Sequence, residues 1–129
     1  MTKKIWIVDD DEGILEAAEI VLQAEGYEVQ TFLDGQSLLD RDFIKGVEVP
    51  DLIILDVLLS GEDGRDICRL LKNQAETAQV PIIMSSANTS AGKVSTDTYG
   101  AEAFLAKPFD IDNLMEVVEK YLAVRQRKQ

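Results

Sequence analysis

Histidine is absent from this 129-residue chain, and cysteine occurs only once, as Cys68. Without histidine the chain has no imidazole for a zinc site or a catalytic triad, and it cannot itself carry phosphohistidine. A single cysteine excludes an internal disulfide and a thiolate metal cluster. Long hydrophobic runs are also missing: none approaches the roughly 20 residues of a membrane span, and no signal-peptide pattern follows Met1. We therefore expect a cytoplasmic protein.

Positive charge is scarce as well. Lysine and arginine number 13 against 24 aspartates and glutamates, which gives a net charge of −11. Such a chain repels nucleic acid and anionic lipid, so we expect no direct binding to either. The length, with 46% hydrophobic and 29% charged residues, fits one globular domain over 1–129. Within it we expect a core over about 4–122 and a polar tail over 123–129.

One stretch organises the chain: four apolar residues, Leu52-Ile53-Ile54-Leu55, run directly into Asp56. A short apolar run of this kind predicts a strand that is buried on both faces of a parallel sheet. Similar strands are expected at 4–8, 27–32, 80–85 and 101–106. Helical spacing predicts helices at 12–25, from 34, at 66–73, weakly at 91–99, and at 111–124, with a loop over 58–64. Five alternations of strand and helix predict an α/β fold, a parallel sheet with helices on both faces.

Polar side chains stand where these strands end. They are Asp9 and Asp10, Asp56, Ser86 and Lys107. Each alone is typical of a helix cap or a turn, but the carboxyl ends of parallel strands share one edge of the sheet. Converging carboxylates repel one another and require a cation, and an oxygen-only donor set suits Mg²⁺. A hydroxyl and an ammonium nearby suit a phosphoryl group, which an aspartate could accept as nucleophile.

The motifs together resemble the receiver domain of bacterial two-component response regulators. They are Val8-Asp9-Asp10, Leu55-Asp56 with Gly64 eight residues on, Ser86-Ala87, and Lys107-Pro108-Phe109. The resemblance extends from Lys4 to about Tyr121. It implies a single flavodoxin-like (βα)5 domain, a doubly wound parallel sheet with strand order 2-1-3-4-5. It also implies a signalling phosphoacceptor, which assists only its own phosphorylation and dephosphorylation.

The resemblance further implies the chemistry of the site. Asp56 would be phosphorylated by a partner histidine kinase or histidine phosphotransfer protein, and Lys107-Pro108 would be a cis peptide. Ser86 and Lys107 would bind the phosphoryl oxygens. The implied ligands of Mg²⁺ are Asp10, Asp56 and the backbone carbonyl of Leu58, with Asp9 helping through water.

The same resemblance implies residues that change conformation on phosphorylation and residues that set the lifetime of the phosphorylated state. Ser86 and Phe104 would be the switch residues, while Leu58 and Asn88 would flank the water that removes the phosphoryl group. The surface that changes would comprise the helix at 91–99, the fifth strand and the last helix. We expect it to bind a downstream protein or a second copy of the chain.

Three positions depart from the commonest family pattern: Ser60 replaces proline, Ser86 replaces threonine, and Phe104 replaces tyrosine. Ser60 suggests a less rigid loop after Asp56.

Two alternative functions fit the sequence less well than a receiver. A phosphatase of the haloacid dehalogenase type needs a second aspartate two residues after the nucleophile, where this chain has Leu58. A flavin- or nucleotide-binding module needs a phosphate cradle after the first strand, where the sequence is acidic. Both a single-domain regulator and a receiver from a longer protein fit the pattern.

Overall fold

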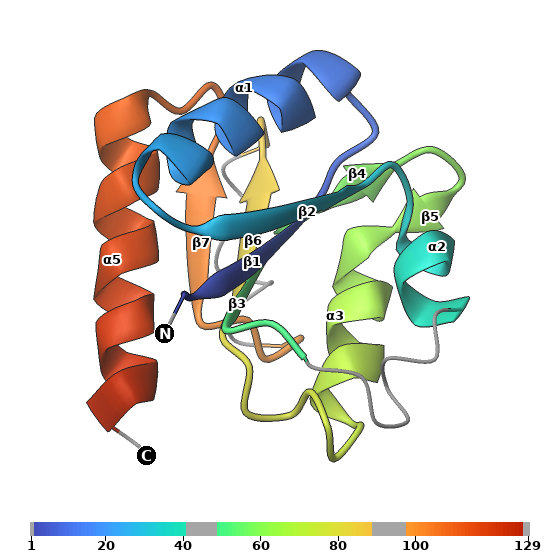
Figure 1. Ribbon diagram of the computed structural model, residues 1–129. Helices are drawn as coiled ribbons and strands as arrows, with labels where there is room; N and C mark the ends of the chain where they lie inside the picture. The colour runs from blue at the N-terminus through green and yellow to red at the C-terminus, as the bar shows by residue number, and fades with distance from the viewer. Residues whose placement is uncertain (1, 41–48, 89–97, 128–129) are drawn as a thin grey trace.

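A five-stranded parallel sheet forms the centre of the protein, in a computed structural model that describes residues 2–40, 49–88 and 98–127. The strand order is β2-β1-β3-β6-β7 (Figure 1). These strands are β1 (Lys4–Val8), β2 (Glu28–Phe32), β3 (Leu52–Asp56), β6 (Ile82–Ser86) and β7 (Ala103–Ala106). In order along the chain they are the first to fifth strands of the sheet. The predicted order 2-1-3-4-5 is therefore confirmed.

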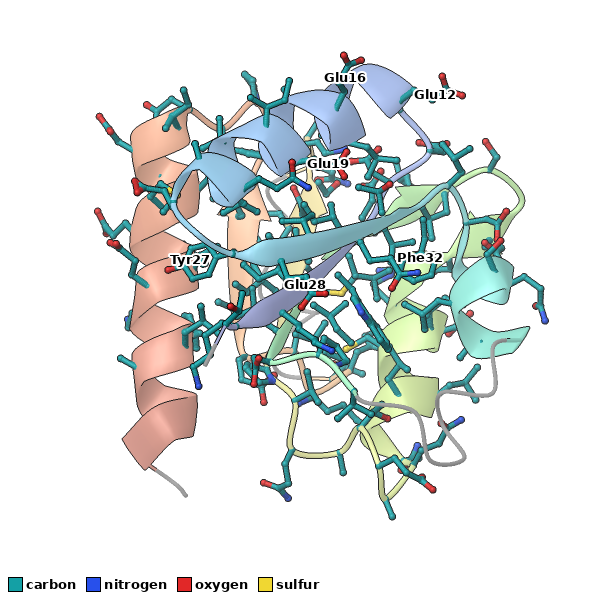
Figure 2. All side chains as sticks on the ribbon, in the orientation of Figure 1. Glu12, Glu16, Glu19, Tyr27, Glu28 and Phe32 are labelled. Atoms are coloured by element: carbon teal, nitrogen blue, oxygen red, sulfur yellow. The ribbon has the colours of Figure 1, made fainter. Side chains whose placement is uncertain are left out.

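Helices cover both faces of the sheet, as predicted (Figure 1). They are α1 (Glu12–Ala24), α2 (Gly35–Asp40), α3 (Gly64–Lys72) and α5 (Ile111–Arg127). Buried residues of α1 and α5 pack on one face, and those of α2 and α3 pack on the other. The outer side of α1 is acidic, and Glu12 and Glu16 point away from the sheet (Figure 2).

Strand β3 lies in the middle of the sheet and is buried along its whole length. Leu52 and Ile54 face α1 and α5, whereas Ile53 and Leu55 face α2 and α3. This alternation follows from the two-residue repeat of a strand, and it explains why the run had to be apolar on both sides. Asp56 is consequently fixed at the end of the central strand of the sheet.

The ends of the helices are set by local hydrogen bonds. Asp11 caps α1, because its side chain accepts from the backbone N–H groups of Gly13 and Ile14. Asp63 caps α3 in the same way through the N–H of Arg65. Helix α3 therefore begins at Gly64, two residues before the predicted start. Helix α5 continues to Arg127, beyond the predicted end at residue 124.

The stretch after β3 differs from prediction. A loop was expected over 58–64, but β4 (Leu58–Leu59) and β5 (Glu62–Asp63) form a small antiparallel hairpin. Two-residue strands are too short to produce a periodic pattern in the sequence. Most of the helix expected at 91–99, and the end of the second helix after residue 40, lie outside the described residues. No helix within the described ranges is long and apolar enough to cross a membrane.

Candidate functional site

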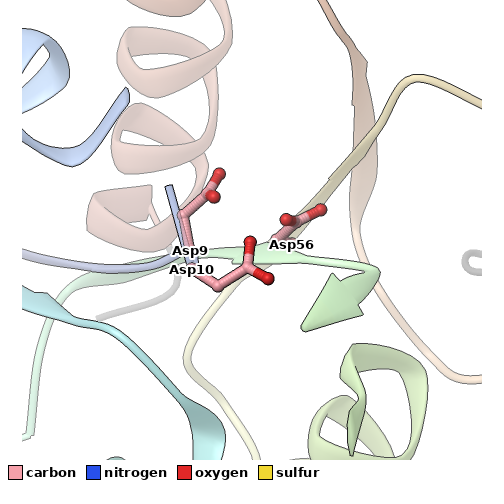
Figure 3. A group of neighbouring side chains, drawn as sticks. All are labelled: Asp9, Asp10 and Asp56. Atoms are coloured by element: carbon pink, nitrogen blue, oxygen red, sulfur yellow. The ribbon is translucent and has the colours of Figure 1, made fainter. Parts of the chain in front are cut away.

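Three carboxylates meet at the carboxyl edge of the sheet. Val8 and Leu55 are paired across β1 and β3, so the residues that follow them emerge side by side. Asp9, Asp10 and Asp56 each offer an oxygen, and these oxygens lie within 4.8 Å of one another (Figure 3). Asp9 is 3% exposed and Asp56 is 5% exposed, while Asp10 faces solvent. The predicted convergence of the three aspartates is confirmed.

Lys107 links two of these carboxylates. It follows β7, and its Nζ lies 2.7 Å from Asp9 Oδ2 and 3.1 Å from Asp56 Oδ2. Its side chain is largely buried, and the Lys107-Pro108 peptide is cis, as predicted. The backbone N–H of Lys107 donates to the carbonyl of Ser86, which connects the ends of the two neighbouring strands. Lys107 therefore reaches across the sheet from β7 to the end of β1.

Burial and neighbouring charges shift the ionisation of this group. Burial raises the pKa of Asp56, and the Asp9 carboxylate raises it further. Lys107 and the N–H of Leu58 act in the opposite direction without cancelling the rise. For Lys107, burial lowers the pKa, but the two paired carboxylates outweigh burial, and the net pKa is raised. One ammonium thus stands against three carboxylates in this cluster, which leaves it negatively charged at neutral pH.

The donor set and the excess of negative charge suit a divalent cation. All three side chains offer oxygen atoms as metal ligands, the ligand type that hard cations prefer. Asp10 opens the cluster to solvent, so a cation held there could retain water, as Mg²⁺ commonly does. Asp9 already accepts from Lys107 and from the N–H of Asp11, which agrees with an indirect role for this residue.

The backbone after β3 is packed tightly against Asp56. The N–H of Leu58 lies 3.3 Å from Asp56 Oδ1, and Gly64 N–H donates to the carbonyl of Val57 at 2.7 Å. A Cβ atom at Gly64 would come within 1.9 Å of the backbone oxygen of Asp56. Only glycine allows this approach. The start of α3 is therefore held against the backbone of Asp56 and Val57.

The remaining predicted residues surround this centre. Ser86 ends β6, next to β3, and is 2% exposed. Its hydroxyl oxygen accepts from the N–H of Asn88 at 3.0 Å. The Leu58 side chain is 67% exposed beside Asp56. Phe104 on β7 is half-buried and packs against the core that faces α2 and α3.

Ser60 takes part in the site in a way that the sequence did not reveal. Its hydroxyl donates to Asp10 Oδ2 at 2.9 Å, from the turn of the β4–β5 hairpin. The sequence marked Ser60 only as a departure from proline. Nothing in the spacing indicates a contact with a residue fifty positions earlier, because the contact depends on how the hairpin folds over the sheet edge.

Known proteins resemble this chain in sequence and fold. Residues 5–119 match the family model described as "Response regulator receiver domain". A proposed response regulator from Chloroflexus aurantiacus is 36% identical, with a TM-score of 0.85 over 95% of this chain and 99% of the other. A CheY-like receiver domain protein from Methanospirillum hungatei is 25% identical, with a TM-score of 0.87 over the full length of both. The receiver domain of DrrB, solved in a BeF3-activated form, is 29% identical, with a TM-score of 0.79 over 95% and 99%.

Proposed function

Because this chain belongs to the response regulator receiver domain family, we propose that Asp56 accepts a phosphoryl group from a phosphohistidine of a histidine kinase or histidine phosphotransfer protein. Receiver domains are signalling phosphoacceptors rather than catalytic enzymes, and this membership removes the phosphatase as a competing interpretation. One observation carries the choice of residue. Asp56 is the carboxylate that is buried at the end of the central strand and is also in contact with Lys107.

The proposed transfer uses the residues around Asp56. An Asp56 carboxylate oxygen forms a bond to phosphorus, the bond from phosphorus to the imidazole nitrogen breaks, and its electron pair returns to the imidazole. Lys107 favours the ionised carboxylate before transfer, and afterwards its ammonium contacts a phosphoryl oxygen. Ser86 supplies a hydroxyl from the neighbouring strand. The N–H of Leu58 holds Oδ1 and so orients the nucleophile.

We propose Mg²⁺ as the resident cation, held by Asp10, Asp56 and the carbonyl of Leu58, with Asp9 acting through water. Bound there, the ion would neutralise charge on the transferring phosphoryl group. The three converging carboxylates and the solvent-facing position of Asp10 support this assignment. Receiver domains work with kinase domains in the cytoplasm, which supports cytoplasmic action for this chain.

The proposed output is a switch made by Ser86 and Phe104. A phosphoryl group adds negative charge and hydrogen-bond acceptors near Ser86, so its hydroxyl would turn to donate to the phosphoryl oxygen. That movement would vacate space beside β6, and Phe104 on the adjacent β7 would fill it, because packed cores do not tolerate voids. The surface carried by β7 and α5 would then bind a downstream protein or a second copy of the chain.

NMR spectra with and without beryllofluoride test the switch. The expected result is shift changes at Ser86, Phe104 and along β7. Changes confined to the residues around Asp56 would contradict it.

Labelling with a small phosphodonor tests the phosphoacceptor. With acetyl phosphate and Mg²⁺, intact-mass measurement should show one added phosphoryl group that is lost in mild base. The Asp56→Asn variant should gain none, and chelation of Mg²⁺ should prevent the gain in the natural sequence. Asp66→Asn, which removes an exposed carboxylate from α3, is the matched control and should be labelled normally. Unchanged labelling of Asp56→Asn would contradict the assignment.

A further inference from the structure

The turn of the β4–β5 hairpin reaches the acidic cluster through one side chain. Ser60 Oγ donates to Asp10 Oδ2 at 2.9 Å and so joins the loop after β1 to the loop after β3. We propose that Ser60 is a positioning residue, which orients the Asp10 carboxylate for the divalent cation. This inference rests on the proposed function, because it concerns how the chain holds the cation of that site.

Asp10 needs such a partner more than the other two carboxylates do. Asp9 accepts from Lys107 and from the N–H of Asp11, and Asp56 accepts from Lys107 and from the N–H of Leu58. Asp10 is exposed, and among the described residues only Ser60 donates a hydrogen bond to its carboxylate. An exposed side chain that must be fixed on binding loses rotamer freedom at that moment, which weakens binding. A hydroxyl that already holds Asp10 reduces this loss.

The hydrogen bond leaves room for a cation. A carboxylate has about four lone-pair positions, and a hydroxyl occupies one of them. Within residues 2–40, 49–88 and 98–127, no hydrogen bond reaches the other oxygen of Asp10 or the second lone pair of Oδ2. Partners outside the first ring of ligands act in this way at many metal sites, because they orient a ligand without touching the metal.

The conformation of the turn allows the hydroxyl of residue 60 to be removed while the turn is kept. Gly61 has a φ of 72°, and no other residue type in the described ranges has a positive φ, so Ser60 has a negative φ. A negative φ followed by a glycine of positive φ is the pattern of a type II turn, in which proline is favoured at the position of Ser60. Ser60→Pro should therefore keep the turn and remove only the donor. Serine at this position lacks the stiffness of proline but supplies the hydroxyl that contacts Asp10.

Titration calorimetry with Mg²⁺ alone tests the proposal. Ser60→Ala and Ser60→Pro should each weaken Mg²⁺ binding by about tenfold, the low end of the effect expected for loss of an outer partner. Ser60→Thr retains the hydroxyl and should restore affinity to near that of the natural sequence. Equal affinity in all four proteins would overturn the proposal. Tighter binding by Ser60→Ala would overturn it too, since the hydroxyl would then compete with the cation.

A double-mutant cycle shows whether Ser60 acts through Asp10. In an Asp10→Asn background, Ser60→Ala should change Mg²⁺ affinity by less than twofold, because the carboxylate that it orients is gone. A full tenfold effect there would mean a general disturbance of the hairpin and would contradict the proposal. Urea unfolding without metal should give similar stabilities for Ser60→Ala and Ser60→Thr.

The proposed function and the role of Ser60 can be refuted separately. Failure of the natural sequence to bind Mg²⁺ or to gain a phosphoryl group would refute both proposals. Normal binding and labelling of the natural sequence, with no loss in Ser60→Ala, would refute only the role of Ser60.

Discussion

Replacing Asp56 with asparagine should stabilise the fold when no metal is present. The amide has almost the shape of the carboxylate, and its oxygen can still accept from the N–H of Leu58. Lys107 keeps its shorter contact, the one to Asp9 at 2.7 Å. The substitution therefore removes one buried negative charge and leaves the remaining ion pair in place.

The expected magnitude follows from the distances. With an effective dielectric constant of about 20, Lys107 at 3.1 Å attracts Asp56 by about 5 kcal/mol, and Asp9, at most 4.8 Å away, repels it by about 3 kcal/mol or more. Asp10 adds a further, solvent-screened repulsion. Because these charge terms nearly cancel, the cost of burying the charge decides the sign. We expect Asp56→Asn to raise the free energy of unfolding by about 1–2 kcal/mol at neutral pH.

The pH dependence has a defined sign. The pKa of Asp56 is raised in the folded protein by burial first and by Asp9 second. A raised pKa means that the folded state binds the proton more tightly than the unfolded state does. Its contribution to stability is complete below the ordinary carboxyl pKa and is lost as the pH rises through the raised value. The advantage of Asp56→Asn should therefore be small in acid and should grow to a plateau towards neutral pH.

Urea unfolding in buffer with a metal chelator measures the difference in unfolding free energy between Asp56→Asn and the natural sequence. Unfolding is followed by the fluorescence of the single tryptophan, Trp6. Asp66→Asn is the control. It removes an exposed carboxylate from the first turn of α3 and should cost a few tenths of a kcal/mol. Added Mg²⁺ should stabilise the natural sequence and have much less effect on Asp56→Asn. A lower stability of Asp56→Asn than of the natural sequence, at neutral pH without metal, would refute the reasoning.

Two further substitutions probe the surroundings of Asp56. Gly64→Ala should lower the free energy of unfolding by about 2–4 kcal/mol in the same assay, since its Cβ would meet backbone atoms of Asp56 that cannot move aside. Gly61→Ala, with open space around it and only an unfavourable φ, should cost about 1 kcal/mol; equal losses would contradict the packing argument. Leu58→Asn should shorten the lifetime of the phosphorylated protein, because leucine cannot orient the attacking water that we expect between positions 58 and 88. Unchanged or slower loss of phosphate, followed by intact mass, would count against that role.

The sequence was sufficient for the sheet and for the convergence of the strand-end side chains, because both follow from the alternation of strands and helices along the chain. The run before Asp56 could be apolar on both faces only in a central parallel strand, and strand ends that share an edge bring Asp9 and Lys107 together. The β4–β5 hairpin was missed because its strands contain two residues each. The early start of α3 depends on Asp63 acting as the cap, and its extended backbone also lets it end β5.

The contacts inside the site were harder to predict from the sequence. Lys107 was expected at a phosphoryl group, but here its shortest ion pair is with Asp9. The two carboxylates are almost equally buried, so the shorter pairing depends on the packed positions of the side chains, which spacing in the sequence does not give. The hydrogen bond from Ser60 to Asp10 has the same origin, since a turn and a loop far apart in sequence are brought together only by the complete sheet.

The most direct test of the central claim is to locate the phosphoryl group itself. The protein is phosphorylated with acetyl phosphate and Mg²⁺ and then reduced with borohydride, which converts an aspartyl phosphate, but not a free aspartate, to homoserine. Peptide sequencing by mass spectrometry should find homoserine at position 56 and unmodified aspartate at positions 9 and 10. Homoserine at another aspartate, with position 56 unmodified, would contradict the account.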